Sequence, residues 1–264
     1  MAIARKKYYK KAVTRGPGPR AAAVLRVPLA TLSTYLIGFP LTAMLVCLGV
    51  LVALVRWRWF LRAGLAFWSN LAFWLVGRRL HVRGRENLAT GEAYVVVANH
   101  SSMYDIPALM AAVPGIAIVG RDYLWRIPLL GSLLRTFRYV PIDTRSARKA
   151  LWAMDEAGKL ARGGTSVGIF PEGTRTTTGR LQDFRRGFIR VVRASGRDVM
   201  PVMIRGTFAL KPKGRLFPDP RERIEVTLLP PIAYAKLAGL GDPEIIAEVK
   251  AVMAEEEGGR DGTR

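Results

Sequence analysis

The sequence holds very few of the side chains that bind metals or act as neutral-pH bases. Its 264 residues include one cysteine, Cys47, and two histidines, His81 and His100. A single cysteine excludes an intrachain disulfide, and so few ligands exclude the Cys/His set of a zinc finger. If an imidazole takes part in chemistry here, it is one of two.

Acidic residues are also scarce. There are 20 Asp and Glu against 41 Lys and Arg, which gives a formal charge of +21 and a pI near 11.0. The first 26 residues contain no acid, but they do contain the bases Arg5, Lys6, Lys7, Lys10, Lys11, Arg15, Arg20 and Arg26. Because a long apolar run follows directly, we predict that residues 1–26 form a basic arm that contacts anionic lipid headgroups. A solvated, disordered arm is the alternative.

Charge is absent from residues 27–55, a run of 29 residues. At about 1.5 Å per residue, a helix of this length exceeds the roughly 30 Å core of a bilayer. A shorter apolar stretch, 63–77, follows among tryptophans and arginines, as is typical of a membrane interface. We predict a membrane-embedded helical pair over residues 27–78. A single crossing would put the basic arm outside, so we expect the pair to enter one leaflet with both ends cytoplasmic.

The rest of the chain alternates strand-like and helix-like segments. Short apolar runs occur at 94–99, 116–120, 139–143, 166–170, 199–204 and 224–229, and helix-period segments separate several of them. This alternation predicts an α/β fold with a mainly parallel sheet covered by helices, preceded by the N-terminal two-helix membrane motif. The predicted α/β domain covers residues 79–240, and a C-terminal helix and tail cover 241–264.

One of the two histidines lies at the end of a predicted strand. In "YVVVANHSSMYDIP", residues 94–107, His100 follows the strand and Asp105 lies inside what we expect to be the next helix. A carboxylate one helical turn away would fix the imidazole tautomer and stabilise the imidazolium, which makes His100 a candidate base. The alternative is a capping box in which Ser102 and Asp105 cap the helix and His100 has no role.

A second polar turn follows the strand 166–170. It reads "FPEGTR", residues 170–175, where proline and glycine favour a turn and Arg175 can bind a phosphate through two nitrogens. In a parallel sheet both loops lie at the same edge and can line one crevice.

Together, "NHSSMYD" and "FPEGTR" resemble the two main motifs of the PlsC family of glycerolipid acyltransferases, typified by 1-acylglycerol-3-phosphate acyltransferase. The likeness covers about residues 82–232 and includes "YVPIDTR" and "VMPVMIRG" in the family's order. It implies an α/β sheet behind a two-helix membrane motif. It also implies transfer of an acyl group from a thioester to the sn-2 hydroxyl of 1-acylglycerol-3-phosphate, giving phosphatidic acid.

The same resemblance assigns roles to residues and partners. His100 would be the base and Asp105 its orienting carboxylate; the predicted substrate-binding residues are Glu172, Gly173, Thr174, Arg175, Arg145 and Arg121. The implied partners are a lysophospholipid acceptor, an acyl-ACP or acyl-CoA donor and anionic membrane lipid. No cofactor or metal is implied, and the expected location is the cell membrane with the active site on the cytoplasmic side.

The chain departs from the family pattern at two cationic positions. Arginine stands at Arg121 and Arg185, where the family often has lysine. A planar guanidinium binds phosphate differently from an ammonium group. A sister acyltransferase acting on another lysophospholipid or a lyso-amino-acid lipid therefore remains an alternative.

Two other classes of protein fit less well. Residues 164–168 match the G-x-S-x-G pattern of serine hydrolases, but that triad needs a later histidine and none follows His100. The charge of +21 would also suit a nucleic-acid-binding protein. No recognition motif supports that class, and the uncharged run of 29 residues favours lipid.

Overall fold

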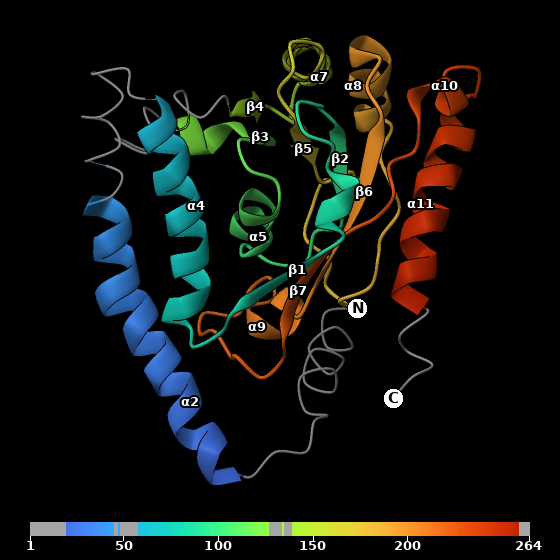
Figure 1. Cartoon of the computed structure of the whole chain (residues 1–264). Coiled ribbons are helices and arrows are strands. Elements are labelled where there is room, and N and C mark those ends of the chain that lie inside the picture. Colours follow the sequence, from blue (N-terminus) through green and yellow to red (C-terminus); the bar gives the residue numbers. More distant parts are fainter. Residues whose placement is uncertain (1–19, 45–46, 48–57, 127–133, 135–138, 259–264) are drawn as a thin grey trace.

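The structure is a computed structural model that describes residues 20–44, 47, 58–126, 134 and 139–258 (Figure 1). Most of the predicted basic arm, and residues 45–46 and 48–57 of the predicted helical pair, lie outside the described residues. The predicted tail after residue 258 does too.

A seven-stranded sheet forms the centre of the described part, in the order β1-β7-β6-β2-β5-β3-β4. The strands are β1 (Leu80–Arg83), β2 (Val95–Ala98), β3 (Ala117–Arg121), β4 (Val140–Ile142), β5 (Val167–Ile169), β6 (Val199–Arg205) and β7 (Ile224–Leu228). All neighbouring pairs are parallel except β6 and β7, which are antiparallel. The prediction of an α/β fold with a mainly parallel sheet is confirmed.

Two features of the sheet were not predicted. Strand β1 was missed because its sequence, LHVR, is short and alternates apolar with basic residues. The reversal at β7 was missed because neither its composition nor its length encodes direction. Strand β7 is fully buried, as central parallel strands are, although it pairs antiparallel with β6.

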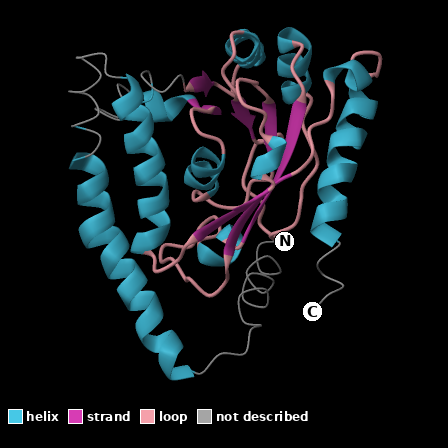
Figure 2. Cartoon of the chain, viewed as in Figure 1, coloured by secondary structure: helices cyan, strands magenta, loops and turns pink. Residues whose placement is uncertain are grey.

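Helices cover both faces of the sheet (Figures 1 and 2). They are α2 (Arg20–Leu32), the π-helical segment η1 (Ser33–Gly38), α4 (Arg58–Leu75), α5 (Asp105–Ala112), α7 (Ala147–Arg162), α8 (Gly187–Ser195), α9 (Thr207–Leu210), α10 (Tyr234–Leu237) and α11 (Asp242–Gly258). Short 3-10 turns occur at η2 (Arg85–Asn87) and η3 (Asp122–Arg126).

Alternate residues of each strand supply two separate cores. Val95 and Val97 of β2 face the core that α7, α8 and α11 cover, whereas Val96 and Ala98 face the core that α4 and α5 cover. This is the period-two alternation of a strand that is buried on both faces. Because both faces of β2 are packed, the position at which the following loop leaves the sheet is fixed.

The N-terminal helix continues through η1 to Met44, and residues Arg26–Met44 are long and apolar enough to cross a membrane. It is the only such helix among the described residues, and most of it is exposed. Its π-helical segment ends just before Pro40, where the missing N–H interrupts the α-helical hydrogen bonding.

Helix α4 packs beside this N-terminal helix (Figure 1). Trp68 donates a hydrogen bond to Thr42 (3.1 Å) and Ser33 donates one to the carbonyl of Leu75. The absence of a side chain at Gly38 allows the close approach, since a Cβ there would lie 3.2 Å from Leu75 Cδ1. Two helices therefore lie side by side, as the predicted pair requires, although part of the segment between them lies outside the described residues.

Candidate active site

The loop after β2 brings His100 and Asp105 together. The imidazole Nδ1 lies 2.9 Å from Asp105 Oδ2; the carboxylate is fully buried, and the imidazole side chain is 18% exposed. Because a carboxylate accepts, Nδ1 carries the proton and Nε2 is left with its lone pair. Nε2 has no hydrogen-bond partner among the described residues. The arrangement is that of a base held ready at the protein surface.

The carboxylate of Asp105 is held by several donors. The backbone N–H groups of Ser101 and Ser102 donate to Oδ2 at 2.5 and 2.7 Å, and the Thr207 hydroxyl donates to Oδ1 at 2.6 Å. One half of the predicted capping box, from the N–H of Ser102 to Asp105, is therefore formed. The Ser102 hydroxyl accepts the N–H of Tyr104 (3.3 Å) and donates to the carbonyl of Lys211 (2.7 Å), so the reciprocal bond from the N–H of Asp105 to this hydroxyl is not. Asp105 is therefore oriented toward the imidazole rather than serving the helix end alone.

The loop after β5 is attached directly to the histidine. Glu172 accepts the backbone N–H of His100 at Oε1 (2.9 Å) and the side-chain amide of Gln182 at Oε2 (2.6 Å). In return, the N–H of Thr176 donates to the carbonyl of His100 (2.8 Å). Burial raises the pKa of Glu172 above its ordinary value. In the structure Glu172 therefore joins the two strand-end loops.

The glycine of the second motif is required by its backbone and its neighbour. Gly173 has φ +69°, and a Cβ there would lie 2.9 Å from Nε of Arg185. The backbone N–H of Arg185 donates to the carbonyl of Pro171 (2.9 Å). This places the Arg185 guanidinium against the Glu172–Gly173 turn, one of the positions where the family often has lysine.

Positive charge gathers beside this turn. Arg175 is half-buried and makes no hydrogen bond or ion pair with a described residue. Burial, and then the charge of Arg175, lowers the pKa of Lys211. Nζ of Lys213 donates to the hydroxyl of Thr174 (3.4 Å). Cations that repel one another, as Arg175 and Lys211 do, form a site suited to an anion such as phosphate.

The two remaining predicted ligands lie at the carboxyl ends of β3 and β4, the strands on the far side of β5 from β2. Arg121 ends β3 and donates to the hydroxyl of Thr144 (3.0 Å). Arg145 follows β4 and pairs with Asp143 (3.0 Å) and Asp122 (3.6 Å). The hydrogen bonds from Arg145 lower the pKa of Asp143 to about 2. Neither arginine contacts the histidine loop in the described residues, so their part in substrate binding stays a prediction.

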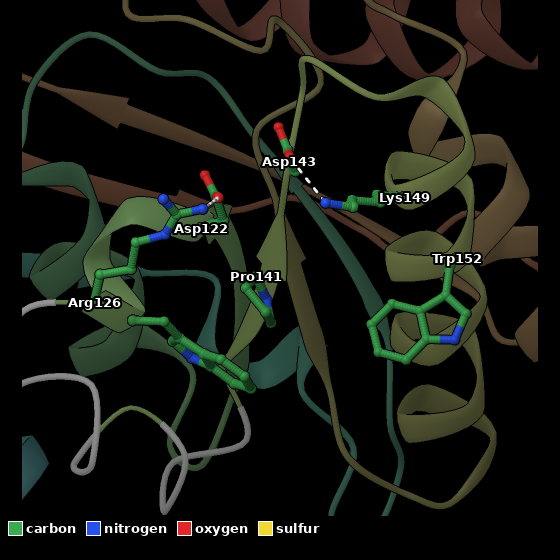
Figure 3. A pocket seen from close by; sticks show the side chains of 7 residues that line it. Asp122, Arg126, Pro141, Asp143, Lys149 and Trp152 are labelled. Carbon is green, nitrogen blue, oxygen red and sulfur yellow. Dashed lines mark hydrogen bonds and ion pairs between the residues drawn. The ribbon is translucent and has the colours of Figure 1, made fainter.

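These ion pairs border a surface pocket of about 440 Å³ at the ends of β3 and β4 (Figure 3). Its lining residues are Asp122, Trp125, Arg126, Pro141, Asp143, Lys149 and Trp152. The pocket is separate from the His100 loop, since none of its lining residues belongs to that loop or to the 170–175 turn.

Three contributors to the site were not found from the sequence. They are Thr207 against Asp105, Gln182 against Glu172, and Phe170, whose ring stacks on His100 with centroids 4.2 Å apart. Phe170 was part of the quoted motif, but no pattern indicated the stacking. Thr207 and Gln182 lie 102 and 10 residues from their partners in the chain, and only folding brings them there.

The serine of the G-x-S-x-G match plays a structural part. Ser166 precedes β5, and its hydroxyl accepts the backbone N–H of Tyr94 at 3.2 Å. It lies at the amino end of the strand, opposite to the nucleophile turn of a hydrolase.

Comparison with known proteins gives the same assignment as the motifs. The family model described as "Acyltransferase" matches residues 79–205. A 1-acyl-sn-glycerol-3-phosphate acyltransferase of Limnanthes alba is 31% identical over 62% of this chain and 58% of its own length. One of Borreliella burgdorferi is 32% identical over 52% of this chain and 56% of its own length. The match thus spans little more than half the length of these relatives.

A solved structure is similar over most of the chain. The crystal structure of the 1-acyl-sn-glycerophosphate acyltransferase PlsC of Thermotoga maritima superposes with a TM-score of 0.75 and 28% identity, covering 87% of this chain and 94% of that one. The family match, the relatives and this fold all agree with the motif pair around His100 and Glu172. Residues 79–205 are an acyltransferase domain by the family model, and the chain as a whole is similar in sequence and fold to the PlsC-type glycerolipid acyltransferases.

Proposed function

We propose that this protein transfers an acyl group from a thioester donor, acyl-ACP or acyl-CoA, to the sn-2 hydroxyl of 1-acylglycerol-3-phosphate, giving phosphatidic acid. The observation that carries the proposal is the 2.9 Å contact between His100 Nδ1 and buried Asp105, which leaves Nε2 as a proton acceptor. The names of the relatives supply the acceptor.

In the proposed reaction, Nε2 of His100 takes the proton of the acceptor hydroxyl as its oxygen attacks the thioester carbonyl. Asp105 stabilises the imidazolium that forms, as a buried carboxylate does in hydrolase triads. The tetrahedral intermediate then expels the thiolate, which takes the proton back from Nε2. The hydroxyl oxygen gains the acyl group, the donor leaves as a thiol, and no external base is consumed.

The acceptor phosphate would lie against the cations beside the second motif. Arg175 can bind two phosphate oxygens through its guanidinium, and Lys211 adds charge from the adjoining loop. Phosphate binding would also remove the repulsion between these two cations. We assign Glu172 to ordering of the loop, because both of its oxygens accept hydrogen bonds from the protein.

We further propose that the N-terminal helix holds the enzyme in the membrane. Large apolar side chains along it are exposed, among them Leu29 at 60%, Leu36 at 66% and Ile37 at 53%. Contiguous exposure of this kind is unfavourable in water and marks contact with lipid. Attachment to one leaflet of the cell membrane would place the active site on the cytoplasmic side, where acyl thioesters are found.

The test uses purified full-length protein with a panel of lysophospholipids and both thioester donors, with products identified by mass spectrometry. We expect phosphatidic acid from 1-acylglycerol-3-phosphate to form fastest. A faster product from another lysophospholipid, or from a lyso-amino-acid lipid, would replace the proposed acceptor with the sister activity.

The matched variants are the two histidines. His100→Ala should lower the rate by about 10²–10⁴-fold, the usual value of a general base. His81→Ala, on β1, should retain activity, and both should still bind membranes. Appreciable activity in His100→Ala would contradict the assignment.

A further inference from the structure

The loop between α9 and β7 exposes two large apolar side chains. We define the 211–219 loop as residues 211–219, with the sequence KPKGRLFPD. Leu216 is 60% exposed and Phe217 is 48% exposed. Lys213 and Arg215 precede the two apolar residues, and Asp219, which follows them, is buried. An apolar tip on a basic loop is unusual for a surface that only meets water.

Hydrogen bonds at both ends hold this loop in one conformation. The N–H of Asp219 donates to the carbonyl of Leu210 (2.7 Å), and Arg215 pairs with the buried carboxylate of Asp219 (2.9 Å). Nζ of Lys211 donates to the carbonyl of Arg215 (3.1 Å). The exposure of the apolar tip is therefore built into the loop and is not a consequence of an unstructured segment.

The loop bridges the N-terminal helix and the histidine loop. The hydroxyl of Tyr35 donates to the carbonyl of Leu216 (2.9 Å), while the hydroxyl of Ser102 donates to the carbonyl of Lys211 (2.7 Å). Tyr104 of the histidine loop in turn hydrogen-bonds Thr34 of the N-terminal helix. Met103, between these residues, is 47% exposed.

The apolar tip is thus attached to the exposed apolar helix. That helix exposes Leu29, Leu32, Leu36, Ile37 and Phe39. The hydrogen bond from Tyr35 to Leu216 joins the two apolar areas. The basic residues of the loop add attraction to anionic headgroups.

We propose that the 211–219 loop is a second membrane-contacting element, which inserts Leu216 and Phe217 into the interface of an anionic bilayer beside the N-terminal helix. Lys213 and Arg215 lie at headgroup level. The loop thereby fixes the height of the histidine loop above the leaflet, so that a lysophospholipid reaches His100 without leaving the interface. This inference rests on the proposed membrane attachment and deepens it.

The single cysteine makes a site-specific test possible. In a Cys47→Ser background, Phe217→Cys is labelled with an environment-sensitive nitrobenzoxadiazole dye and the full-length protein is mixed with phosphatidylcholine–phosphatidylglycerol vesicles. The control is Leu151→Cys, a 48% exposed apolar position on α7, on the other face of the sheet. We expect a blue shift, and quenching by nitroxide lipids, for the 217 label and neither change for the 151 label.

Vesicle flotation in the same samples tests the proposed membrane attachment separately from the proposed role of the 211–219 loop. If the protein floats with the vesicles but the 217 label keeps its emission in water, the loop proposal is overturned and the membrane attachment stands. If the protein does not float, both are overturned. A blue shift at both labels would show general adsorption and would also overturn the specific role of the loop.

Activity gives an independent readout. The double variant Leu216→Ser/Phe217→Ser should raise the apparent KM for acceptor presented in vesicles by about tenfold, since most of the burial of two apolar side chains in lipid is lost. Its rate with a short-chain acceptor below the micellar concentration should equal that of the unmodified protein. Leu151→Ser/Trp152→Ser is the matched control on α7, and an equal KM increase there would contradict the proposal.

Discussion

At the residue scale, Asp105, which contacts the proposed base His100, is itself held by a buried hydroxyl from α9. Oδ1 of Asp105 accepts the hydroxyl of Thr207 at 2.6 Å, and that hydroxyl lies 2.9 Å from the hydroxyl of Ser101. Thr207 is fully buried at the start of α9. We infer that Thr207 is a positioning residue, which holds the carboxylate in the plane that the imidazole requires.

The corresponding prediction concerns Thr207→Val, which keeps the shape and removes the donor. A hydrogen bond to a charged group is worth about 1.5–3 kcal/mol, so kcat should fall roughly 10- to 100-fold. KM for the acceptor should stay unchanged, because no substrate contact is lost. Thr207→Ser restores the donor and should restore most of kcat; steady-state kinetics on the three proteins decides. A rise in KM with constant kcat would instead place Thr207 in substrate binding.

A second residue-scale prediction follows from the raised pKa of Glu172. Its ordinary value is 4.5, and burial is the main cause of the increase. A raised folded pKa adds stability below the unfolded pKa, and that contribution is lost as the pH rises through the folded value. Relative to Glu172→Gln, the unmodified protein should therefore lose free energy of unfolding as the pH rises above about 4.5. Denaturation curves in detergent across this range measure the difference.

The control for that experiment is Glu255→Gln, at an exposed position of α11. The difference in free energy of unfolding between Glu255→Gln and the unmodified protein should stay constant across the pH range. A difference between Glu172→Gln and the unmodified protein that does not change with pH would show that burial does not disfavour the Glu172 charge.

At the element scale, the site is made by the carboxyl ends of two adjacent strands. β2 and β5 pair in parallel, with Val97 opposite Ile169, so the loops that follow them leave the sheet side by side. Helices set how rigid that edge is. Helix α7 packs closely on α8, because Gly158 leaves room for Ala194: a Cβ at residue 158 would lie 2.5 Å from the Ala194 Cβ.

The prediction at this scale is that Gly158→Ala destabilises the fold. Helix propensity alone favours alanine by about 1 kcal/mol, but overpacking typically costs about 1–3 kcal/mol. We expect a net loss in the free energy of unfolding, with kcat per folded molecule retained because α7 does not touch the His100 loop. Chemical denaturation followed by circular dichroism measures it.

Gly64→Ala in α4 is the matched helical glycine. A Cβ there meets no described atom within 4 Å, so alanine should be neutral or stabilising. If Gly158→Ala were equally neutral, the close packing of α7 on α8 would not be a determinant of stability.

At the scale of the whole molecule, two attractions would act together in the proposed contact with a bilayer. Salt weakens the electrostatic attraction that arises from the charge of +21. It does not weaken the attraction between lipid and the exposed apolar surface of the helix Arg26–Met44. We predict that washing membranes with roughly 1 M NaCl leaves the full-length protein in the membrane fraction, since screening removes only the first attraction. Detergent should be needed for release, as judged by immunoblots of pellet and supernatant. Release by salt alone would show that the apolar helix does not enter the lipid.

Much of the fold could be predicted from local patterns, because short segments show the spacing of apolar residues that marks a buried strand or a helix face. Six of the seven described strands begin or end within two residues of a predicted run. Strand β1 was not predicted, because four residues that include two basic side chains are also typical of a loop. The antiparallel direction of β7 was not predicted, because the direction of a strand depends on the side from which the chain enters the sheet.

The candidate site divides in the same way. His100, Asp105 and the 170–175 turn could be selected because each motif is continuous in the chain, and the loop conformation brings the first two to 2.9 Å. Thr207 and Gln182 could not, since no motif links them to Asp105 and Glu172, and the exposure of Leu216 and Phe217 is known only once the chain has folded. Arg121 and Arg145 were selected by resemblance, and the structure shows them occupied by Thr144 and by Asp143 and Asp122.

The order of residues by itself indicated the family, the α/β alternation, the apolar N-terminus and His100 as the candidate base, because motif, period and composition are local properties of the chain. Only the tertiary structure decided which groups surround the Asp105 carboxylate, how Glu172 joins two loops, and which apolar side chains remain exposed next to the helix Arg26–Met44. Those outcomes depend on distances between residues that are far apart along the chain, and such distances exist only after the two cores have packed.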